Sequence, residues 1–410
     1  MAGGPGSYVF GAEEKKELMD VIESGYLFRY GTEGVDGFQH KVASFETELA
    51  QKLQFKYAIA TSSGTGALLC CLAALGIGAG DEVIVPGYTF IASISSIILA
   101  NAIPVLAEVD DSLTIDPTRI EELITDQTKA IMPVHMLGNP CDMDAIMAIA
   151  KKHNLYVIED CCQAFGASYK GRRVGVFGDI AAYSLNVFKT ITAGDGGAVA
   201  TNDDLLYERA FGFHDQGHKP SRMGVEVGNR SIIGMNMRMN ELTGAVALAQ
   251  LRKLDDILVT LRGKKAKLKS YLTDLPNVGF RKINDADGEC ATLLTLLFDT
   301  PELAEKFGEK IGSKPIACSG WHVYNNMEQV LNKTTGAAAN CPYHCPRFPV
   351  EREYHKHMLP QTDFNTARAI NISIGVVDKG LGSGYGINIH STDAGIEEVG
   401  KKLRAIISEL

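Results

Sequence analysis

The chain has 410 residues and a formal net charge of −9 at pH 7; 45% of its residues are hydrophobic and 22% are charged. These values are ordinary for a globular enzyme and exclude a disordered or fibrous chain. A net negative charge argues against a nucleic-acid binder, which normally presents a basic face to phosphates. A chain of this length is expected to form two or more structural units.

Residues 1–14 are glycine-rich and then acidic, without the positive start and apolar stretch of a secretory signal. Apolar runs such as Ile94–Ala100 are too short to cross a bilayer. We therefore expect a cytoplasmic protein with no membrane partner. The nine scattered cysteines are expected to be reduced thiols. Cys341, His344 and Cys345 resemble half of a metal site, but no second pair follows at ligand spacing, so no metal is expected.

Short apolar runs alternate with helical patterns from Lys56 to Asn202. The predicted strands are Tyr57–Thr61, Glu82–Val85, Pro104–Val109, Ala130–Val134, Leu155–Glu159 and Ile180–Ser184. Most are apolar almost throughout, which is typical of parallel strands buried on both faces. Helical patterns such as Thr65–Leu75 and Met143–Lys152 lie between them. The alternation predicts an α/β fold with a mostly parallel sheet flanked by helices.

The chain changes character after a long helical pattern at about Asn240–Leu272. A strand at Ala291–Phe298, a helix from Pro301 and a final helix at about Thr392–Leu410, capped by Ser391 or Thr392, follow. We predict a large domain with an N-terminal helical segment (1–255) and a smaller C-terminal α+β domain (256–410). The glycine-containing stretch at 379–386 lacks the lysine–serine ending of a P-loop, and it is predicted to be a flexible loop.

Three groups of residues at predicted strand ends have a chemical character. The first is the run of small residues from Ser62 to Leu68, which follows a strand and opens a helix. Small residues let the backbone approach an anion, and the free amides of a helix start point at it. The pattern indicates a phosphate site, although a run of small residues is often only a turn.

The second group is the acidic pair Glu159-Asp160 at the end of an apolar strand. Two acids there are costly unless they are paired or functional. A carboxylate at this place can pair with a protonated pyridine nitrogen of a cofactor, and a helix cap or a buried ion pair is the structural alternative.

The third group is Lys189, which lies between an apolar strand ending at Ser184 and the glycine-rich turn at 194–197. Desolvation lowers the pKa of a lysine and makes it a nucleophilic amine suited to Schiff-base chemistry. A single lysine is more often a surface residue. The phosphate turn, the strand-end acid and the loop lysine in this order are far more specific together than singly.

Together these segments resemble the DegT/DnrJ/EryC1/StrS family of aminotransferases, whose members act on sugars and use pyridoxal 5′-phosphate on a fold of type I. The resemblance runs over nearly the whole chain and is densest from Ser62 to Leu242. It includes Asp81–Pro86 with Thr89-Phe90, Val134–Gly138, Glu159–Ala164, the Lys189 loop and Gly234–Leu242.

The resemblance implies a role for each matching residue. Lys189 would hold the cofactor as a Schiff base and shuttle protons, and Asp160 would pair with the pyridine nitrogen. Gln163 would contact the ring near its phenolic oxygen, and Phe90 would stack on the ring. The phosphate would be held by Gly64, Thr65 and Ser184, with Asn236 supplied by the neighbouring subunit of a homodimer with shared active sites. From the residues alone the support is weaker, because an aromatic residue such as Phe90 in an apolar helix is usually a core residue and an asparagine such as Asn236 in a loop is usually a turn residue.

The implied reaction moves an amino group from an amino acid, glutamate or glutamine, to a keto or aldehyde group of a sugar-like acceptor. The family also contains dehydratases in which a histidine replaces the lysine, so retention of Lys189 favours transamination over a dehydratase or lyase. A regulatory protein on the same scaffold is the third hypothesis, and the acidic charge opposes a DNA-binding role.

Other residues concern the lining of the site and the acceptor. His135 and His214 are candidate site residues, and a structural role is at least as plausible for each. Segments at 28–30, 211–218 and 321–326 resemble the branch that makes 8-amino-3,8-dideoxy-manno-octulosonate. Nucleotide-sugar and cyclitol acceptors remain open.

Overall fold

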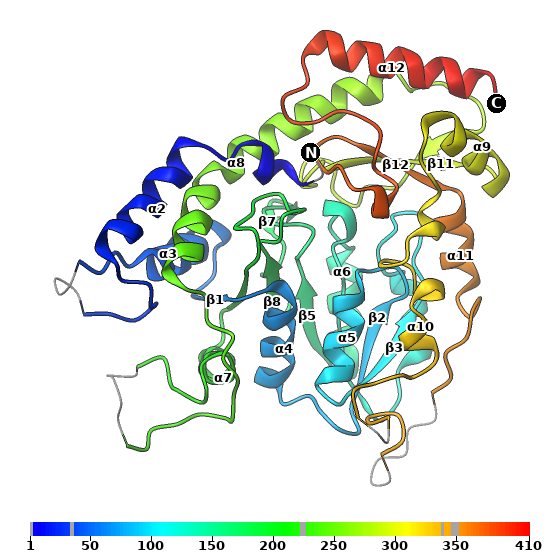
Figure 1. The fold of residues 1–410 in the computed structure, drawn as a ribbon. Coiled ribbons are helices and arrows are strands. Elements are labelled where there is room, and N and C mark those ends of the chain that lie inside the picture. Colours follow the sequence, from blue (N-terminus) through cyan, green and yellow to red (C-terminus); the bar gives the residue numbers. More distant parts are fainter. Residues whose placement is uncertain (1–2, 33–36, 222–226, 338–339, 346–351) are drawn as a thin grey trace.

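The computed structural model describes residues 3–32, 37–221, 227–337, 340–345 and 352–410, and it is built around one large sheet (Figure 1). The strands of this sheet lie in the order β1-β9-β8-β5-β4-β2-β3. Their bounds are Tyr57–Thr61 (β1), Glu82–Pro86 (β2), Ile103–Ala107 (β3), Thr128–Ile131 (β4), Tyr156–Asp160 (β5), Ile180–Ser184 (β8) and Gly197–Thr201 (β9). The predicted α/β fold with a mostly parallel sheet is confirmed.

One strand of the large sheet runs against the others. β9 pairs antiparallel with both β1 and β8, whereas the pairs β8–β5, β5–β4, β4–β2 and β2–β3 are parallel. All six predicted strands form, and β9 is an additional one. β9 is the antiparallel neighbour of β8 and follows it in the chain. The loop that joins them therefore lies at the carboxyl end of β8, and Lys189 is in this loop.

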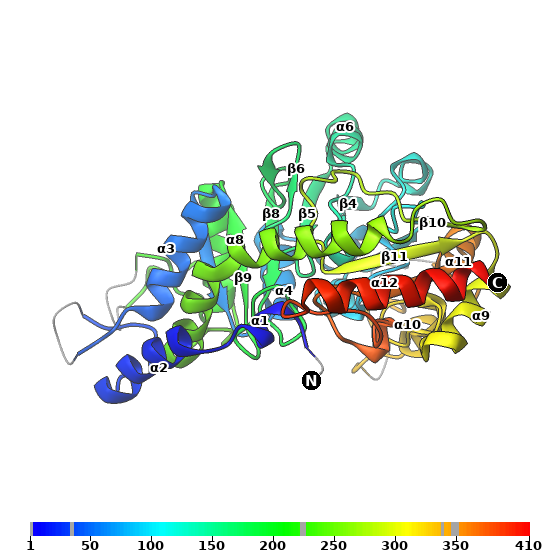
Figure 2. The ribbon, with the colours of Figure 1, turned by 90° about the horizontal axis from the view of Figure 1, so that it is seen from above.

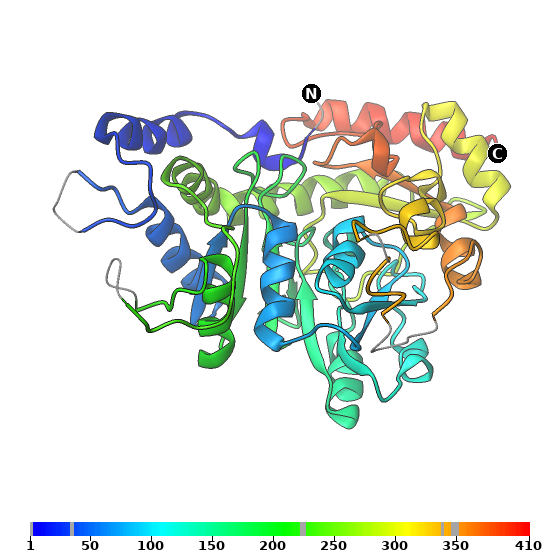
Figure 3. The same ribbon diagram turned by 60° about the horizontal axis from the view of Figure 1, so that its bottom comes forward.

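Helices cover both faces of the sheet, since the apolar strands present side chains alternately to each side. Ile180 and Ala182 pack in one core with Leu68, whereas Ala181 and Tyr183 pack in another with Phe45. The first face carries α4 (Gly64–Leu75), α5 (Ile91–Leu99) and α7 (Asp204–His214), and the opposite face carries α3 (Lys41–Leu53), α6 (Met143–His153) and α8 (Glu241–Ser270) (Figure 3).

The C-terminal part has its own small antiparallel sheet, in the order β10-β11-β12. Its elements are β10 (Val278–Phe280), β11 (Leu293–Phe298), α9 (Pro301–Ile311), α10 (Glu328–Leu331), α11 (Pro360–Ala367), β12 (Ala369–Ser373) and α12 (Asp393–Ser408). Thr392 caps α12, because its hydroxyl accepts from the amide of Gly395 at 3.3 Å.

The long helix α8 joins the two parts of the molecule. Arg252 in its first half pairs with Glu48 of α3 at 2.6 Å, and Lys267 near its end pairs with Asp393 of α12 at 2.8 Å. Figure 2 shows α8 and α12 side by side. The expected boundary after residue 255 falls inside this unbroken helix, and the division into two domains stays a prediction. No helix of the described residues is long and apolar enough to span a membrane.

The N-terminal segment packs against the Lys189 loop. It comprises Gly3, Gly4 and α1 (Pro5–Tyr8), and α2 (Ala12–Ser24) follows it. The amide of Gly4 and the hydroxyl of Ser7 both donate to the carbonyl of Val187, each at 2.9 Å. Gly3 exchanges two backbone hydrogen bonds with Val377 at 3.1 and 2.9 Å. The segment therefore ties the lysine loop to a loop of the C-terminal part. A small hairpin of β6 (Ser168–Tyr169) and β7 (Arg172–Arg173) completes the described strands.

Substituting Gly4 by alanine should destabilise the protein. The new Cβ would lie 2.5 Å from the carbonyl carbon and oxygen of Phe188, closer than real Cβ contacts allow. The segment or the lysine loop must then shift, at a cost of about 1–3 kcal/mol in the free energy of unfolding, measured by urea denaturation. Gly263→Ala is the matched control, because its Cβ meets no atom within 4 Å. Equal stability of the two variants would contradict the close approach.

Candidate active site

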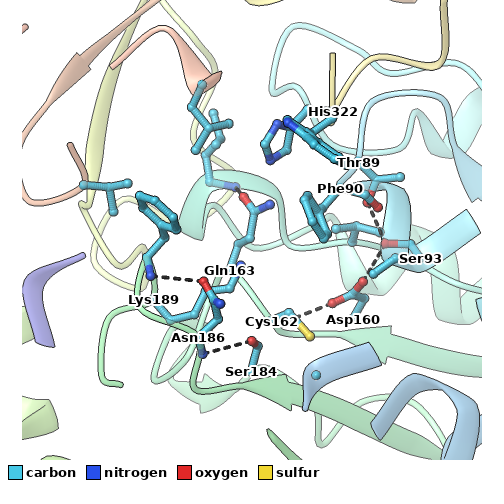
Figure 4. A pocket seen from close by; sticks show the side chains of 18 of the residues that line it. Thr89, Phe90, Ser93, Asp160, Cys162, Gln163, Ser184, Asn186, Lys189 and His322 are labelled. Carbon is cyan, nitrogen blue, oxygen red and sulfur yellow. Dashed lines mark hydrogen bonds between the residues drawn. The ribbon is translucent and has the colours of Figure 1, made fainter. Parts of the chain in front are cut away.

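A cavity of about 590 Å³ opens at the carboxyl ends of β5 and β8, where open α/β sheets bind their ligands (Figure 4). Its walls also include the starts of α4 and α5, the Lys189 loop and the stretch from Val376 to Leu381. Seven of the eight expected site residues line this one cavity: Gly64, Thr65, Phe90, Asp160, Gln163, Ser184 and Lys189. Asn236 is exposed and lies outside it.

One end of the cavity is built to receive an anion. Gly64 and Thr65 form the first turn of α4, where backbone amides lack partners within the helix. Ser63 caps this helix by accepting from the amide of Gly66 at 3.0 Å. A Cβ on Gly64 would lie 2.7 Å from Cβ of Ser184. Glycine is therefore required there, and it brings the helix start against the hydroxyl-bearing end of β8.

The two neighbouring acids of β5 point to opposite faces of the sheet and have different surroundings. Glu159 is fully buried, and its oxygens accept from His135 Nε2 at 3.0 Å and from the amides of Gly175, Phe177 and Gly178 at 2.6–2.8 Å. Asp160 faces the cavity. Glu159 thus has the structural role of a saturated buried acid, and Asp160 is the acid that a ligand reaches.

The carboxylate of Asp160 is held from two sides. Its Oδ2 accepts from the hydroxyl of Ser93 at 2.7 Å, and its Oδ1 accepts from the amide of Cys162 at 3.0 Å. Ser93 is held in turn by Thr89, with 2.7 Å between their hydroxyl oxygens. These bonds fix the direction of a negative charge at the cavity floor (Figure 4). Ser93 lies on the first turn of α5, and no sequence pattern marked it.

The amine of Lys189 enters the cavity from the loop between β8 and β9. Its backbone closes a turn by donating to the carbonyl of Asn186 at 2.9 Å, and Nζ lies 5.9 Å from the ring centre of Phe90. Burial lowers the pKa of Lys189 below its ordinary 10.5, against the opposing pull of Cys162, Asp160 and Asp378. Desolvation therefore favours the neutral, nucleophilic form of this amine.

Phe90 is not a core aromatic, because it precedes α5 with 38% of its surface exposed on the cavity wall. His322 lies beside it, with 5.4 Å between ring centres. Burial, and then the charge of Lys189, lowers the pKa of His322 to about 3. His322 is accordingly neutral at physiological pH, with Nδ1 at 2.9 Å from the hydroxyl of Ser319.

Gln163 is oriented by a turn that the C-terminal part of the chain supports. Its Oε1 accepts from the amide of Leu137 at 3.1 Å, which directs the amide nitrogen to act as the donor toward a ligand. Leu137 adopts a left-handed conformation with φ of 55°. Buried Arg281 stabilises this turn by donating to the carbonyls of Met136 and Leu137 at 3.1 and 2.9 Å.

The structure places both candidate histidines outside the cavity and shows a defined turn in the stretch predicted to be a flexible loop. Neither His135 nor His214 lines the cavity: His135 pairs with Glu159, and His214 lies 3.1 Å from Arg29. The stretch predicted as a flexible loop contains a 3-10 turn at Lys379–Leu381, and Asp378 caps it by accepting from Gly380 at 2.8 Å. Sequence reasoning missed its contribution to the cavity wall.

The described residues contain one group of three metal-capable side chains: His135, Glu159 and Cys161. It does not include the cluster of Cys341, His344 and Cys345. The carboxylate of Glu159 is already saturated with hydrogen-bond donors. The group is therefore explained as a buried hydrogen-bond network.

The residues of the cavity fit pyridoxal phosphate. The cradle at Gly64 suits its phosphate, the fixed carboxylate of Asp160 suits its protonated ring nitrogen, and the amine of Lys189 suits its aldehyde. Phe90 offers an exposed flat face between these groups. All three chemical ends of the cofactor therefore find complementary groups in one cavity.

Comparison with known proteins agrees with this arrangement. The model of the DegT/DnrJ/EryC1/StrS aminotransferase family matches residues 10–363. A GDP-perosamine synthase of Escherichia coli O157:H7 is 42% identical over 247 residues, which are 60% of this chain and 65% of that enzyme, slightly less than two thirds of its length. An L-glutamine:2-deoxy-scyllo-inosose aminotransferase of Streptomyces kanamyceticus is 36% identical over 290 residues, 67% of each chain. The solved aminotransferase of Psychrobacter cryohalolentis has a TM-score of 0.78 at 28% identity, covering 98% of both chains.

The lowered pKa of Lys189 predicts reactivity at unusually low pH. A lysine with a depressed pKa is deprotonated, and hence nucleophilic, at pH values where an ordinary lysine is charged. Cofactor-free protein, treated with pyridoxal phosphate and then borohydride, should be labelled at Lys189 with a half-maximal rate below pH 10.5. Peptide mass spectrometry across a pH series measures this. Labelling spread evenly over surface lysines would contradict the desolvated amine.

Proposed function

Because the chain belongs to the DegT/DnrJ/EryC1/StrS aminotransferase family, we propose that it is a pyridoxal-phosphate-dependent aminotransferase. It moves an amino group from an amino acid to a carbonyl of a sugar-like acceptor. The observation that carries the proposal is the meeting of a desolvated lysine, a fixed carboxylate and an anion cradle in one cavity.

Each of these groups has a separate task in the reaction. Bound pyridoxal phosphate supplies an electron-poor ring that stores the charge left when an amino acid loses its α-proton. Asp160 holds the proton on the ring nitrogen, because its carboxylate is fixed by Ser93 and the amide of Cys162. Lys189 Nζ removes and returns protons, for which its lowered pKa suits it. Gly64, Thr65 and Ser184 anchor the phosphate, and Phe90 covers the ring.

The acceptor is proposed to be a ketone or aldehyde of a sugar or cyclitol, with glutamate or glutamine as the amino donor. The names of the two curated relatives support this choice, since one concerns perosamine and the other transfers from L-glutamine to 2-deoxy-scyllo-inosose. The resemblance to the octulosonate branch remains a prediction. Lys189 is the residue that favours transamination over the dehydratase alternative.

Replacing Lys189 by alanine should abolish turnover, and Asp160→Asn should slow it by roughly 10²–10⁴-fold, the usual cost of losing a positioned proton-handling group. The wild-type protein should show a visible absorbance band from its lysine-linked cofactor, which borohydride removes. Turnover is followed with a glutamate or glutamine donor and a panel of ketosugars and cyclitol ketones. Full activity of Lys189→Ala would refute the proposed reaction.

Glu159→Gln is the matched control for the aspartate. Because Glu159 faces away from the cavity, this change should lower stability while the absorbance of the folded holoenzyme stays that of wild type. Unchanged turnover in Asp160→Asn would remove Asp160 from its proposed role.

We further propose a homodimer with shared active sites. The segment around Asn236 exposes Ile233 and Met235, with 94% and 55% of their surfaces open. Phe28, 48% exposed, adjoins it through a contact of 5.6 Å with the guanidinium of Arg238. Contiguous exposed apolar side chains mark interaction surfaces. In the proposed dimer a second copy covers this surface, and Asn236 serves the phosphate cradle of its neighbour.

All nine cysteines are free thiols, which supports a reducing, cytoplasmic location.

Mixing two inactive variants tests the shared site. If Asn236 serves the neighbouring subunit, then a dimer of one Lys189→Ala chain and one Asn236→Asp chain has one intact site. Co-refolded in equal amounts, the mixture should regain about a quarter of the wild-type activity, because half of the dimers are mixed and each has one working site. Activity no higher than the sum of the separate variants would contradict shared sites.

A further inference from the structure

Trp321 is the only tryptophan of the chain, and it lies on the cavity wall with 60% of its surface exposed. Its ring is 6.4 Å from that of Phe90, centre to centre, and the two planes are inclined by 29°. Leaving so large an apolar ring in water forgoes the stabilisation that burial gives. The two exposed rings adjoin on the cavity wall, and Nζ of Lys189 lies 5.9 Å from the ring centre of Phe90.

The backbone around Trp321 is held firmly, so its ring has a defined place. The carbonyl of Trp321 accepts from the amide of Ile91, and the carbonyl of His322 accepts from the amide of Thr89, both at 2.9 Å. Val323 and Tyr324, which follow, are buried. The segment therefore pairs with the stretch that leads into α5. Of residues 321–324, only Trp321 is exposed.

We infer that Trp321 is the platform on which the six-membered ring of the proposed sugar or cyclitol acceptor lies. This inference rests on the proposed function. The C–H face of such a ring is apolar and slightly positive, whereas the face of an indole is apolar and electron-rich, so the two surfaces are complementary. The ring's hydroxyl groups stay at its edge, where polar groups reach them.

The two substrates differ in what they can contact. Both react at the Lys189 end, 5.9 Å from the ring centre of Phe90, and Trp321 adjoins the same Phe90 ring at 6.4 Å between ring centres. An open-chain donor needs no contact with the indole. Trp321 thus acts as a specificity-determining residue for the acceptor half of the reaction and leaves the donor half unaffected.

The sole tryptophan provides a binding signal that does not require activity. Titration of the wild-type holoenzyme with GDP-perosamine or with 2-deoxy-scyllo-inosose should give a saturable change in tryptophan emission for at least one of them. The open-chain 2-oxoglutarate should give none. Absence of a saturable change with both ring compounds, or the same change with 2-oxoglutarate, would overturn the inference.

Variants give the second measurement. Trp321→Ala should raise the KM for the ring acceptor roughly tenfold, the scale of losing one aromatic contact. Trp321→Phe should recover most of the loss, and the rate of the half-reaction with the amino donor should be unchanged in both. Tyr156→Ala is the matched control, since Tyr156 is an aromatic 46% exposed at the opposite end of β5.

The outcomes separate the inference from the proposed function. A Trp321→Ala enzyme with an unchanged KM, or with an equally slowed donor half-reaction, overturns the platform while leaving the aminotransferase intact. A wild-type holoenzyme that fails to react with any amino donor refutes the proposed function, and the emission titration still decides whether a ring binds at Trp321.

Discussion

The geometry of the site depends on the alternation of side chains along β5. In a strand, neighbouring residues face opposite sides of the sheet, so Glu159 and Asp160 cannot share one environment. The inward bonds of Glu159 to His135 and three backbone amides fix the strand end and the segment at 175–178. That anchored strand end then presents Asp160 to the cavity in one orientation. The hydrogen-bonded carboxylate of Glu159 on one face of the sheet thus holds the strand end from which Asp160 faces the cavity on the other.

The other site groups come from separate parts of the chain and meet because their supports are shared. Ser93 of α5 holds Asp160, and the same helix start carries Phe90. Arg281, from the C-terminal part, holds the turn that orients Gln163. Interactions between the large sheet and the C-terminal part therefore reach the cavity directly, and the wall at 376–381 completes it.

The large sheet and most residues of the candidate site could be predicted from the sequence, because their local patterns are strong. Most of the buried strands were apolar almost throughout, and the order of small-residue turn, strand-end acid and loop lysine marked the site. The residues alone left open which acid faces the ligand, and the family resemblance selected Asp160. Ser93, Arg281 and Asp378 could not be found in this way, because each acts through a contact between segments distant in sequence. His322 is a similar case, since its neutrality arises from burial in the folded protein.

The tie between Gly3 and Val377 has a consequence for how the protein matures. The brace that supports the Lys189 loop joins two segments that lie far apart in the sequence. All strands of the large sheet precede residue 202, but the support of the lysine loop is complete only after residue 377 has left the ribosome. Firm support of the lysine loop therefore requires both segments to be present and folded against each other.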